Sequence, residues 1–212
     1  MTFARESWPF VSPFLAAAVV AAVLGHLLWA AGLATLGLLV LMFFRNPRRR
    51  YEGPGSTVLA PADGLVTRVD EVEDSAVAPG RLRRVVTFLS VFDVHVQRLP
   101  ASGEVVVSSL RPGRKVAAFR HDAGEVNEGH LSVLRLPDGA LIGIRQIAGL
   151  FARRVVCHLR PGERRTRGEL MGLIKFGSRV DLIVPPGYRI LVKPGDRVRN
   201  GETPMAEPGE AA

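Results

Sequence analysis

The sequence has 212 residues, and its 28 lysines and arginines against 20 aspartates and glutamates give a formal net charge of +8. Hydrophobic residues make up 47% of the chain and charged residues 23%, which excludes wholesale disorder and collagen-like repeats. The only cysteine, Cys157, excludes a disulfide framework and any metal site built from several cysteines.

The first long segment, residues 7–44, carries no charged side chain. As one helix it would be about 57 Å long, whereas the hydrocarbon core of a bilayer is about 30 Å thick. We therefore predict two helices, about Pro13–Leu24 and Leu27–Phe44, with a break at Gly25-His26. The segment is too long for a cleaved signal peptide, and a buried hairpin of a soluble protein is the alternative.

A basic cluster follows this segment directly, Arg45-Asn46-Pro47-Arg48-Arg49-Arg50. The positive-inside rule places such a cluster, and the domain behind it, in the cytoplasm. Positive charge beside an apolar segment favours anionic lipid head groups as partners. The absence of a basic patch interleaved with aromatic residues argues against nucleic acid. We expect residues 1–50 to form a membrane-associated helical segment at the cytoplasmic face of the cell membrane.

Beyond Tyr51 the pattern changes to short runs rich in β-branched residues, interrupted by glycine and proline. Such runs predict strands. They are Leu65–Val69, Arg84–Leu89, Gly103–Val107, Leu131–Leu136, Leu141–Ile144, Val155–Leu159 and Asp181–Val184. Between two of them, Pro137-Asp138-Gly139 predicts a hairpin turn.

Strands at this spacing indicate a sandwich or a barrel. Two glycine-centred segments, Ala60–Val66 and Val192–Gly201, resemble the turns of the barrel-sandwich hybrid fold. We therefore expect a mainly β fold, with a barrel-sandwich-hybrid-like domain over residues 51–205 behind the N-terminal helical hairpin. Residues 206–212 are expected to form a disordered tail.

One pair of residues suggests chemistry on the chain itself. Ser178 follows Gly177 between a possible strand at Leu170–Phe176 and another at Val180–Val184. Glycine permits backbone conformations in which the next hydroxyl approaches the preceding carbonyl. The Ser178 hydroxyl would then attack the Gly177 carbonyl, and the resulting ester would eliminate and hydrolyse to a pyruvoyl group. A Gly-Ser pair in an ordinary β-turn is the alternative.

Such a reaction needs a base, and His95 comes directly after an apolar strand. A histidine, with an ordinary pKa of about 6.5, suits this task, more so when a carboxylate orients the ring. Asp63, in Pro-Ala-Asp-Gly, is one candidate for the orienting carboxylate and Asp93 is a second. The alternative is a hydrogen-bonded structural histidine at position 95 and an ordinary turn aspartate at position 63.

Taken together, these segments resemble the phosphatidylserine decarboxylase proenzymes, specifically the short bacterial and archaeal type. The resemblance covers residues 44–195 in the family's order. The matching segments are Phe44–Arg49, Ala60–Val66, Ser90–Arg98, Asn127-Glu128, Gln146–Gly149, Ala152–Cys157 and Met171–Asp181.

The resemblance implies that the chain cuts itself between Gly177 and Ser178 and that residues 1–177 and 178–212 stay together as a heterodimer. Ser178 would become a pyruvoyl cofactor that forms a Schiff base with the serine amine of phosphatidylserine. Phosphatidylethanolamine and CO2 would be the products, with Asp63, His95 and Ser178 acting together in self-cleavage. No metal is expected, and the resemblance leaves higher oligomers open.

The sequence departs from the longer members of the family at one point. They have two histidines three residues apart near His95, whereas this chain has Arg98 at the second position. Either His95 serves in both self-cleavage and decarboxylation, or another group takes one of the roles. Arg98, Arg153 and Arg154 are candidates for binding the lipid phosphate.

Two other functions fit parts of the sequence. A membrane-anchored zinc peptidase would need a His-x-His pair, and no two of the five histidines are two residues apart. A non-enzymatic membrane-tethered β module would have the same helical hairpin and would not cleave itself. Two fragments in the purified protein indicate the decarboxylase, and one intact chain indicates either alternative.

Overall fold

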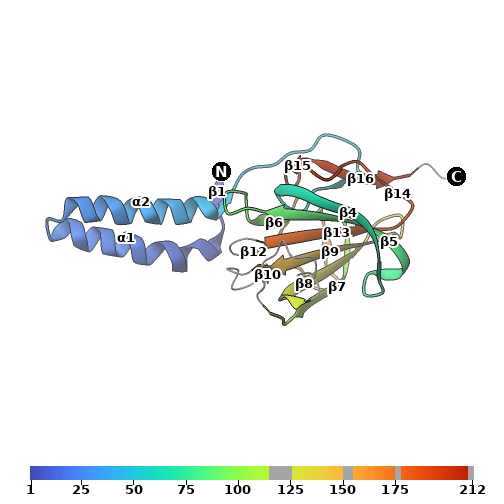
Figure 1. Ribbon diagram of the computed structural model, residues 1–212, viewed down its shortest axis with the longest axis horizontal. Coiled ribbons are helices and arrows are strands. Elements are labelled where there is room, and N and C mark those ends of the chain that lie inside the picture. Colours follow the sequence, from blue (N-terminus) through green and yellow to red (C-terminus); the bar gives the residue numbers. More distant parts are fainter. Residues whose placement is uncertain (115–125, 150–154, 175–177, 210–212) are drawn as a thin grey trace. The chain divides into compact units, whose positions relative to one another are not determined.

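The computed structural model describes residues 1–114, 126–149, 155–174 and 178–209 and divides into two compact units, Met1–Arg48 and Arg49–Ala212. The predicted mainly β fold with an N-terminal helical pair is confirmed (Figure 1).

The first unit is a helical hairpin whose ends are tied by a short sheet. Its elements are β1 (Thr2–Phe3), the 3-10 helix η1 (Arg5–Ser7), α1 (Trp8–Val23), α2 (Leu27–Phe43) and β2 (Arg45–Asn46), and β1 pairs antiparallel with β2. The predicted break is present, and Gly25 takes a φ of 79°, which favours glycine. Helix α1 begins earlier than predicted and contains Pro13, which removes only one helical hydrogen bond near the start.

The two helices pack closely and leave many apolar side chains exposed. A Cβ atom on Gly37 of α2 would lie 3.2 Å from the Cβ atom of Phe14, so glycine permits the close approach. Trp8, Leu28 and Trp29 are among the large apolar side chains that face outward. The stretch Arg5–Val23 is long and apolar enough to cross a membrane, and Leu27–Phe43 is apolar but shorter.

The second unit consists of three antiparallel sheets. The largest has the order β11-β7-β8-β9-β13-β5-β4-β15, and the smaller ones have the orders β10-β12-β6 and β14-β16-β3. The large sheet comprises β4 (Gly64–Asp74), β5 (Ala78–Leu89), β7 (Gly103–Arg111), β8 (Gly129–Arg135), β9 (Leu141–Ala148), β11 (Arg164–Arg165), β13 (Ser178–Val184) and β15 (Arg197–Val198). The small sheets comprise β3 (Val58–Leu59), β6 (Val96–Arg98), β10 (Val155–Cys157), β12 (Leu170–Ile174), β14 (Tyr188–Ile190) and β16 (Pro204–Pro208).

The seven strands predicted from sequence all fall on observed strands, and β8 and β9 form the hairpin predicted at Pro137-Asp138-Gly139. The C-terminal end differs from the prediction. Strand β16 includes Ala206, which is fully buried, so strand pairing continues past the predicted start of the tail. Pairing with β3 and β14 provides the burial that a local pattern does not reveal.

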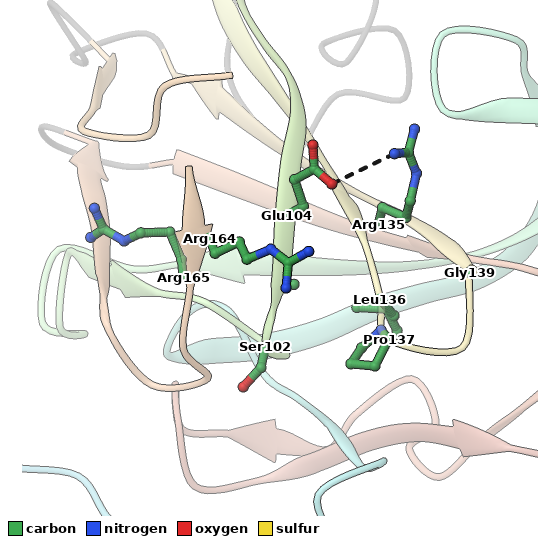
Figure 2. A pocket seen from close by; sticks show the side chains of 9 residues that line it. Ser102, Glu104, Arg135, Leu136, Pro137, Gly139, Arg164 and Arg165 are labelled. Carbon is green, nitrogen blue, oxygen red and sulfur yellow. Dashed lines mark ion pairs between the residues drawn. The ribbon is translucent and has the colours of Figure 1, made fainter. Parts of the chain in front are cut away.

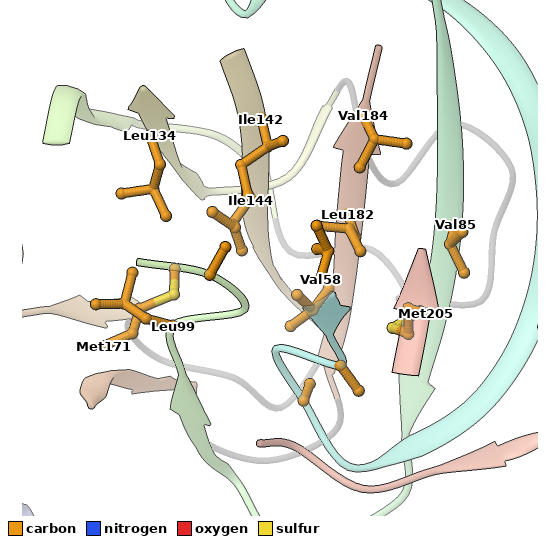
Figure 3. Close-up of a cluster of buried hydrophobic side chains, with 14 of the residues drawn as sticks. Val58, Val85, Leu99, Leu134, Ile142, Ile144, Met171, Leu182, Val184 and Met205 are labelled. Carbon is orange, nitrogen blue, oxygen red and sulfur yellow. The ribbon is translucent and has the colours of Figure 1, made fainter. Parts of the chain in front are cut away.

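One hydrophobic core joins all three sheets (Figure 3). Leu182 of β13, Met171 of β12 and Met205 of β16 come from different sheets and share this cluster. Strand β13 lies between β5 and β9, and all seven of its residues are buried. The N-terminal residue of this central strand is Ser178, so the fold places that hydroxyl at the end of the core.

Candidate active site

Ser178 opens strand β13 and is fully buried. It pairs with Leu89 on β5 and with Ala148 on β9. Side chains of directly opposed residues lie on the same face of a sheet, and Leu89 and Ala148 belong to the core. The Ser178 side chain therefore points to the inner, core-facing side of the large sheet, where its Oγ has no hydrogen-bond partner among the described residues. Gly177 lies outside the described residues.

His95 lies immediately before β6 and is buried. Its Nδ1 is 2.9 Å from the carbonyl oxygen of Asp93. Because a carbonyl only accepts, Nδ1 carries the proton, and in the neutral ring the lone pair that can take a proton is on Nε2. The His95 carbonyl accepts a hydrogen bond of 3.3 Å from the Ile174 amide, four residues before Ser178. This bond ties the His95 backbone to the end of the strand that leads to Ser178.

The carboxylate of Asp93 stabilises the loop that carries His95. One oxygen accepts from the Ser90 amide at 2.8 Å and from the Ser90 hydroxyl at 2.7 Å, and the other accepts from Arg197 at 3.0 Å. Asp93 thus orients the imidazole through its backbone carbonyl, while its carboxylate closes the turn.

Asp63 is joined to the His95 segment through Asn200. One Asp63 oxygen accepts from the Asn200 amide nitrogen at 2.7 Å and from its side-chain Nδ2 at 2.6 Å. The same Nδ2 lies 3.2 Å from the carbonyl oxygen of Val96, the residue after His95. Arg49 donates to the other Asp63 oxygen at 2.8 Å. Asn200 therefore brings Asp63 and the His95 segment into one buried cluster.

The sequence alone does not identify Asn200 as a site residue, although Asn200 stands in the glycine-centred segment 192–201. The residue after Asp63, Gly64, has no room for a side chain. A Cβ atom on Gly64 would lie 2.2 Å from the carbonyl oxygen of Phe88, so only glycine allows β4 to approach β5 at this point.

Comparison with known proteins identifies the family. The family model described as phosphatidylserine decarboxylase matches residues 36–206. Relatives named phosphatidylserine decarboxylase proenzyme include one from Symbiobacterium thermophilum, 45% identical over 202 residues, covering 94% of this chain and 93% of the relative. Another, from Nitrosomonas eutropha, is 40% identical over 204 residues, covering 96% and 94%. The chain belongs to the phosphatidylserine decarboxylase family.

A third relative of that name, from Saccharopolyspora erythraea, is 42% identical over 205 residues, covering 94% of this chain and 87% of the relative. Membership of the decarboxylase family confirms the resemblance seen in the sequence and decides against the zinc peptidase and the non-enzymatic module. The matched range contains Asp63, His95 and Ser178.

Arg98 is the position at which this chain differs from the longer decarboxylases. It belongs to a charged cluster that also contains Arg49, Asp63 and Glu202. Its Nη1 donates to the carbonyl of Gly168 at 2.8 Å. Burial, and then the nearby positive charge of Arg49, lower the pKa of the Arg98 guanidinium below its ordinary value, while Asp63 and Glu202 oppose that shift. The other predicted phosphate-binding residues, Arg153 and Arg154, lie outside the described residues.

A pocket of about 320 Å³ opens beside this charged cluster. Its lining includes Arg49, which bonds to Asp63, Gly168, which bonds to Arg98, and Gly201, which follows Asn200. On another side the Arg167 guanidinium lies 4.9 Å from the centre of the Tyr51 ring. The pocket therefore combines positive charge with a lining residue, Arg49, that bonds to Asp63.

His130 is also buried on the inner face. Its Nδ1 lies 3.3 Å from the Ser132 hydroxyl and its Nε2 lies 3.2 Å from the Ser108 hydroxyl. Burial lowers the pKa of His130 below its ordinary value. Both ring nitrogens therefore contact hydroxyl groups and burial favours the neutral ring, which favours a structural role for His130 over that of a second base.

A larger pocket, of about 530 Å³, lies elsewhere on the large sheet (Figure 2). Its lining includes Arg135, which forms an ion pair with Glu104 at 3.6 Å, and Arg164. Arg135 is opposite Leu141 at the start of β9, whereas Ser178 is opposite Ala148 at its end, about 24 Å away along the strand. This pocket is too distant to form part of the site around Ser178.

Proposed function

We propose that this chain is a proenzyme that cuts itself between Gly177 and Ser178 and then decarboxylates phosphatidylserine to phosphatidylethanolamine and CO2. The observation that carries the proposal is the buried Ser178 hydroxyl at the start of β13, with His95 bonded to the strand that leads to it. The relatives' name, phosphatidylserine decarboxylase proenzyme, supports both the substrate and the processing.

In the proposed cleavage, the Ser178 oxygen bonds to the Gly177 carbonyl carbon while the bond from that carbon to the Ser178 nitrogen breaks. The hydroxyl proton passes to the base, and the released amine takes up a proton, which leaves an ester. Removal of the proton on the α-carbon of residue 178 then expels the Gly177 carboxylate and leaves dehydroalanine. Its imine tautomer takes up water and releases ammonia, which yields a pyruvoyl group on the chain of residues 178–212.

His95 is the proposed base, and its hydrogen bond to Asp93 assigns the nitrogen that acts. Because Nδ1 is held protonated by the Asp93 carbonyl, Nε2 takes the hydroxyl proton. After cleavage the same nitrogen returns a proton during the lipid reaction. We propose that His95 serves in both reactions, since His130, the other buried histidine among the described residues, has both nitrogens engaged.

Asp63 supports this site in two ways. Through Asn200 it holds the backbone beside His95, and its negative charge favours the protonated imidazole that forms during the reaction. Arg49 and Asn200 hold the carboxylate in place by three hydrogen bonds. Asp63 therefore acts as a positioning residue with an electrostatic contribution.

The pyruvoyl group made from Ser178 is the proposed cofactor, and the surroundings of Ser178 fit it. When present, this group supplies the electron sink for loss of CO2 from an amino acid head group. Leu89 and Ala148 flank the residue in the sheet and belong to the core, so water is excluded there, and a desolvated carboxylate loses CO2 more readily. Arg98, Arg153 and Arg154 remain the proposed residues for binding the lipid phosphate, and Arg49, which lines the 320 Å³ pocket, is a further candidate.

The N-terminal helices are proposed to hold the enzyme at the cytoplasmic face of the membrane, where the substrate lies. Residues 1–50 would be the membrane segment and residues 51–205 the catalytic domain. The full chain should sediment with membranes and need detergent for release, because so many apolar side chains of α1 and α2 are exposed. Recovery of the full chain in the soluble fraction without detergent would contradict this attachment.

Mass spectrometry of the purified protein under denaturing conditions tests the function. We expect chains of 177 and 35 residues, the smaller one resistant to Edman sequencing because a pyruvoyl group has no free amine. Hydroxylamine should react with its carbonyl and abolish decarboxylation. Ser178→Ala should stay in one piece and be inactive. A wild-type chain that decarboxylates phosphatidylserine while intact would overturn the proposal.

A further inference from the structure

Two glutamines are completely buried between the His95 segment and the inner face of the large sheet. Gln97 is in β6 and Gln146 is in β9. The Gln97 Nε2 atom donates to the carbonyl of His95 at 2.8 Å, and the Gln146 Nε2 atom donates to the Oε1 atom of Gln97 at 3.0 Å. A chain of hydrogen bonds thus runs from the backbone of the proposed base to strand β9.

The donor-to-acceptor direction along these hydrogen bonds is fixed at the His95 end. A backbone carbonyl only accepts, so Gln97 must present its NH2 group there and its oxygen to Gln146. Gln146 must then use its own NH2 group toward Gln97. The atom left at the far end is the Gln146 Oε1, a pure acceptor, which is buried and has no hydrogen-bond partner among the described residues.

A matching donor lies on the neighbouring strand. Gln146 is opposite Val180 and Ala148 is opposite Ser178, so Gln146 and Ser178 share a face as diagonal neighbours. Cβ atoms at such positions are about 7 Å apart, within reach of a long side chain. The Ser178 hydroxyl is the second buried polar group here without a described partner. Buried polar groups are rarely left unpaired, and these two are complementary.

The two atoms are not bonded to each other in this structure. We propose that rotation of the Ser178 side chain brings its hydroxyl to the Gln146 Oε1 before self-cleavage, and that this hydrogen bond sets the position of the hydroxyl for the reaction. This role rests on the proposed function. The bond restricts rotation of the Ser178 side chain before His95 takes the proton. The hydrogen bonds made by Gln97 and Gln146 start at the His95 carbonyl and would end at the Ser178 hydroxyl. The two glutamines would therefore couple the position of the base to that of the nucleophile.

Self-cleavage of freshly synthesised full-length protein, followed by denaturing gel, tests this role before any substrate is involved. Gln146→Met keeps the length of the side chain and removes the acceptor, so we expect the cleavage half-time to rise about 10- to 100-fold, as for a misplaced reacting group. Thr87→Val is the matched control. Thr87 is buried, opposite Val180 on β5, and so occupies the equivalent diagonal position on the other side of Ser178. This variant should cleave at the wild-type rate.

The variant Gln146→Glu adds a second measurement, the pH dependence of the cleavage rate, which a purely structural role of Gln146 would not change. Its carboxyl group can accept from Ser178 and donate to Gln97 only while protonated. The ratio of the Gln146→Glu cleavage rate to the wild-type rate should therefore approach one at low pH and fall as the pH rises. If Gln146→Met does not fold, as judged by thermal melting, this pH dependence alone decides the matter.

The outcomes separate the two proposals. Wild-type protein that does not cleave would contradict the proposed function. Wild-type cleavage together with an unchanged rate in Gln146→Met, or a pH-independent ratio in Gln146→Glu, would overturn the role of Gln146 and leave the proposed function intact. Normal cleavage of Gln146→Met with weakened use of phosphatidylserine would also overturn it and would assign Gln146 to the substrate.

Discussion

The two faces of strand β13 are both buried and are built in opposite ways. On the outer face, Arg179 donates to both oxygens of Asp181 at 2.6 and 2.7 Å. On the inner face, Ser178 has a polar atom with no described partner, followed by the apolar residues Val180 and Leu182. One face neutralises its charges locally, which serves stability. The other leaves the Ser178 hydroxyl without a described partner, as the proposed self-cleavage requires.

The outer face extends this neutralisation to neighbouring strands. Arg84 of β5 donates to both oxygens of Asp70 in β4, at 2.9 and 2.6 Å. Burial alone would raise the pKa of Asp70, but the hydrogen bond and charge of Arg84 outweigh it and lower the pKa. We therefore expect changes on the inner side of β13 to alter the rate of self-cleavage. Changes on the outer side should instead alter the free energy of unfolding.

The largest effect is expected from removal of His95, the proposed base. His95→Ala should slow self-cleavage by about 10²- to 10⁴-fold, the usual contribution of a positioned general base. The half-time of the full-length chain on a denaturing gel measures this. The melting temperature of the uncleaved variant should stay close to that of Ser178→Ala. Cleavage of His95→Ala at the wild-type rate would remove His95 from the reaction.

Changes on the outer face should lower the stability of the protein and leave the cleavage rate unchanged. Arg179→Leu leaves Asp181 buried without its bidentate partner, which should lower the free energy of unfolding by about 3–5 kcal/mol. Denaturant titration in detergent, in the uncleavable Ser178→Ala background, measures this. Replacing both Arg179 and Asp181 by leucine should recover most of the loss. If the single change slowed cleavage in the folded protein without lowering stability, the division between the faces would be wrong.

Asp63→Asn should have a smaller effect on cleavage than loss of His95. Asparagine can keep a hydrogen bond to Asn200 but loses the charge that faces Arg49 and that we propose favours protonated His95. We expect cleavage to slow about 10-fold, equivalent to about 1.4 kcal/mol. Glu202→Gln is a suitable control, because it removes the other carboxylate that bonds to Arg49 and leaves Asp63 in place. Equal slowing in both variants would indicate a general effect of the charged cluster.

The smallest effect concerns His130 and pH. Its pKa is lowered in the folded chain, so the unfolded chain binds a proton more readily. Stability should therefore fall as the pH drops through the unfolded value of about 6.5 and level off below the folded pKa. Comparing urea midpoints at pH 7.5 and pH 5, His130→Gln should lose less stability on acidification than the parent chain. An identical loss in both would contradict the lowered pKa.

Much of this protein is determined by local sequence. The uncharged stretch and the glycine at position 25 define the helical hairpin, because length, hydropathy and a positive φ are local properties. Alternating β-branched runs and the turn at Pro137-Asp138-Gly139 define the central strands for the same reason. Residue chemistry and the matching family segments are enough to make Ser178, His95 and Asp63 candidates.

Only the tertiary structure decided how those residues are supported. Asn200 stands far from Asp63 in sequence and bonds to it in the fold, and the assignment of the His95 proton to Nδ1 depends on a backbone carbonyl that no residue pattern reveals. Gln97 and Gln146 look like ordinary polar residues until strand pairing buries both. The physical reason is that strand propensity depends on near neighbours, whereas burial and hydrogen-bond direction depend on which distant strands are brought together.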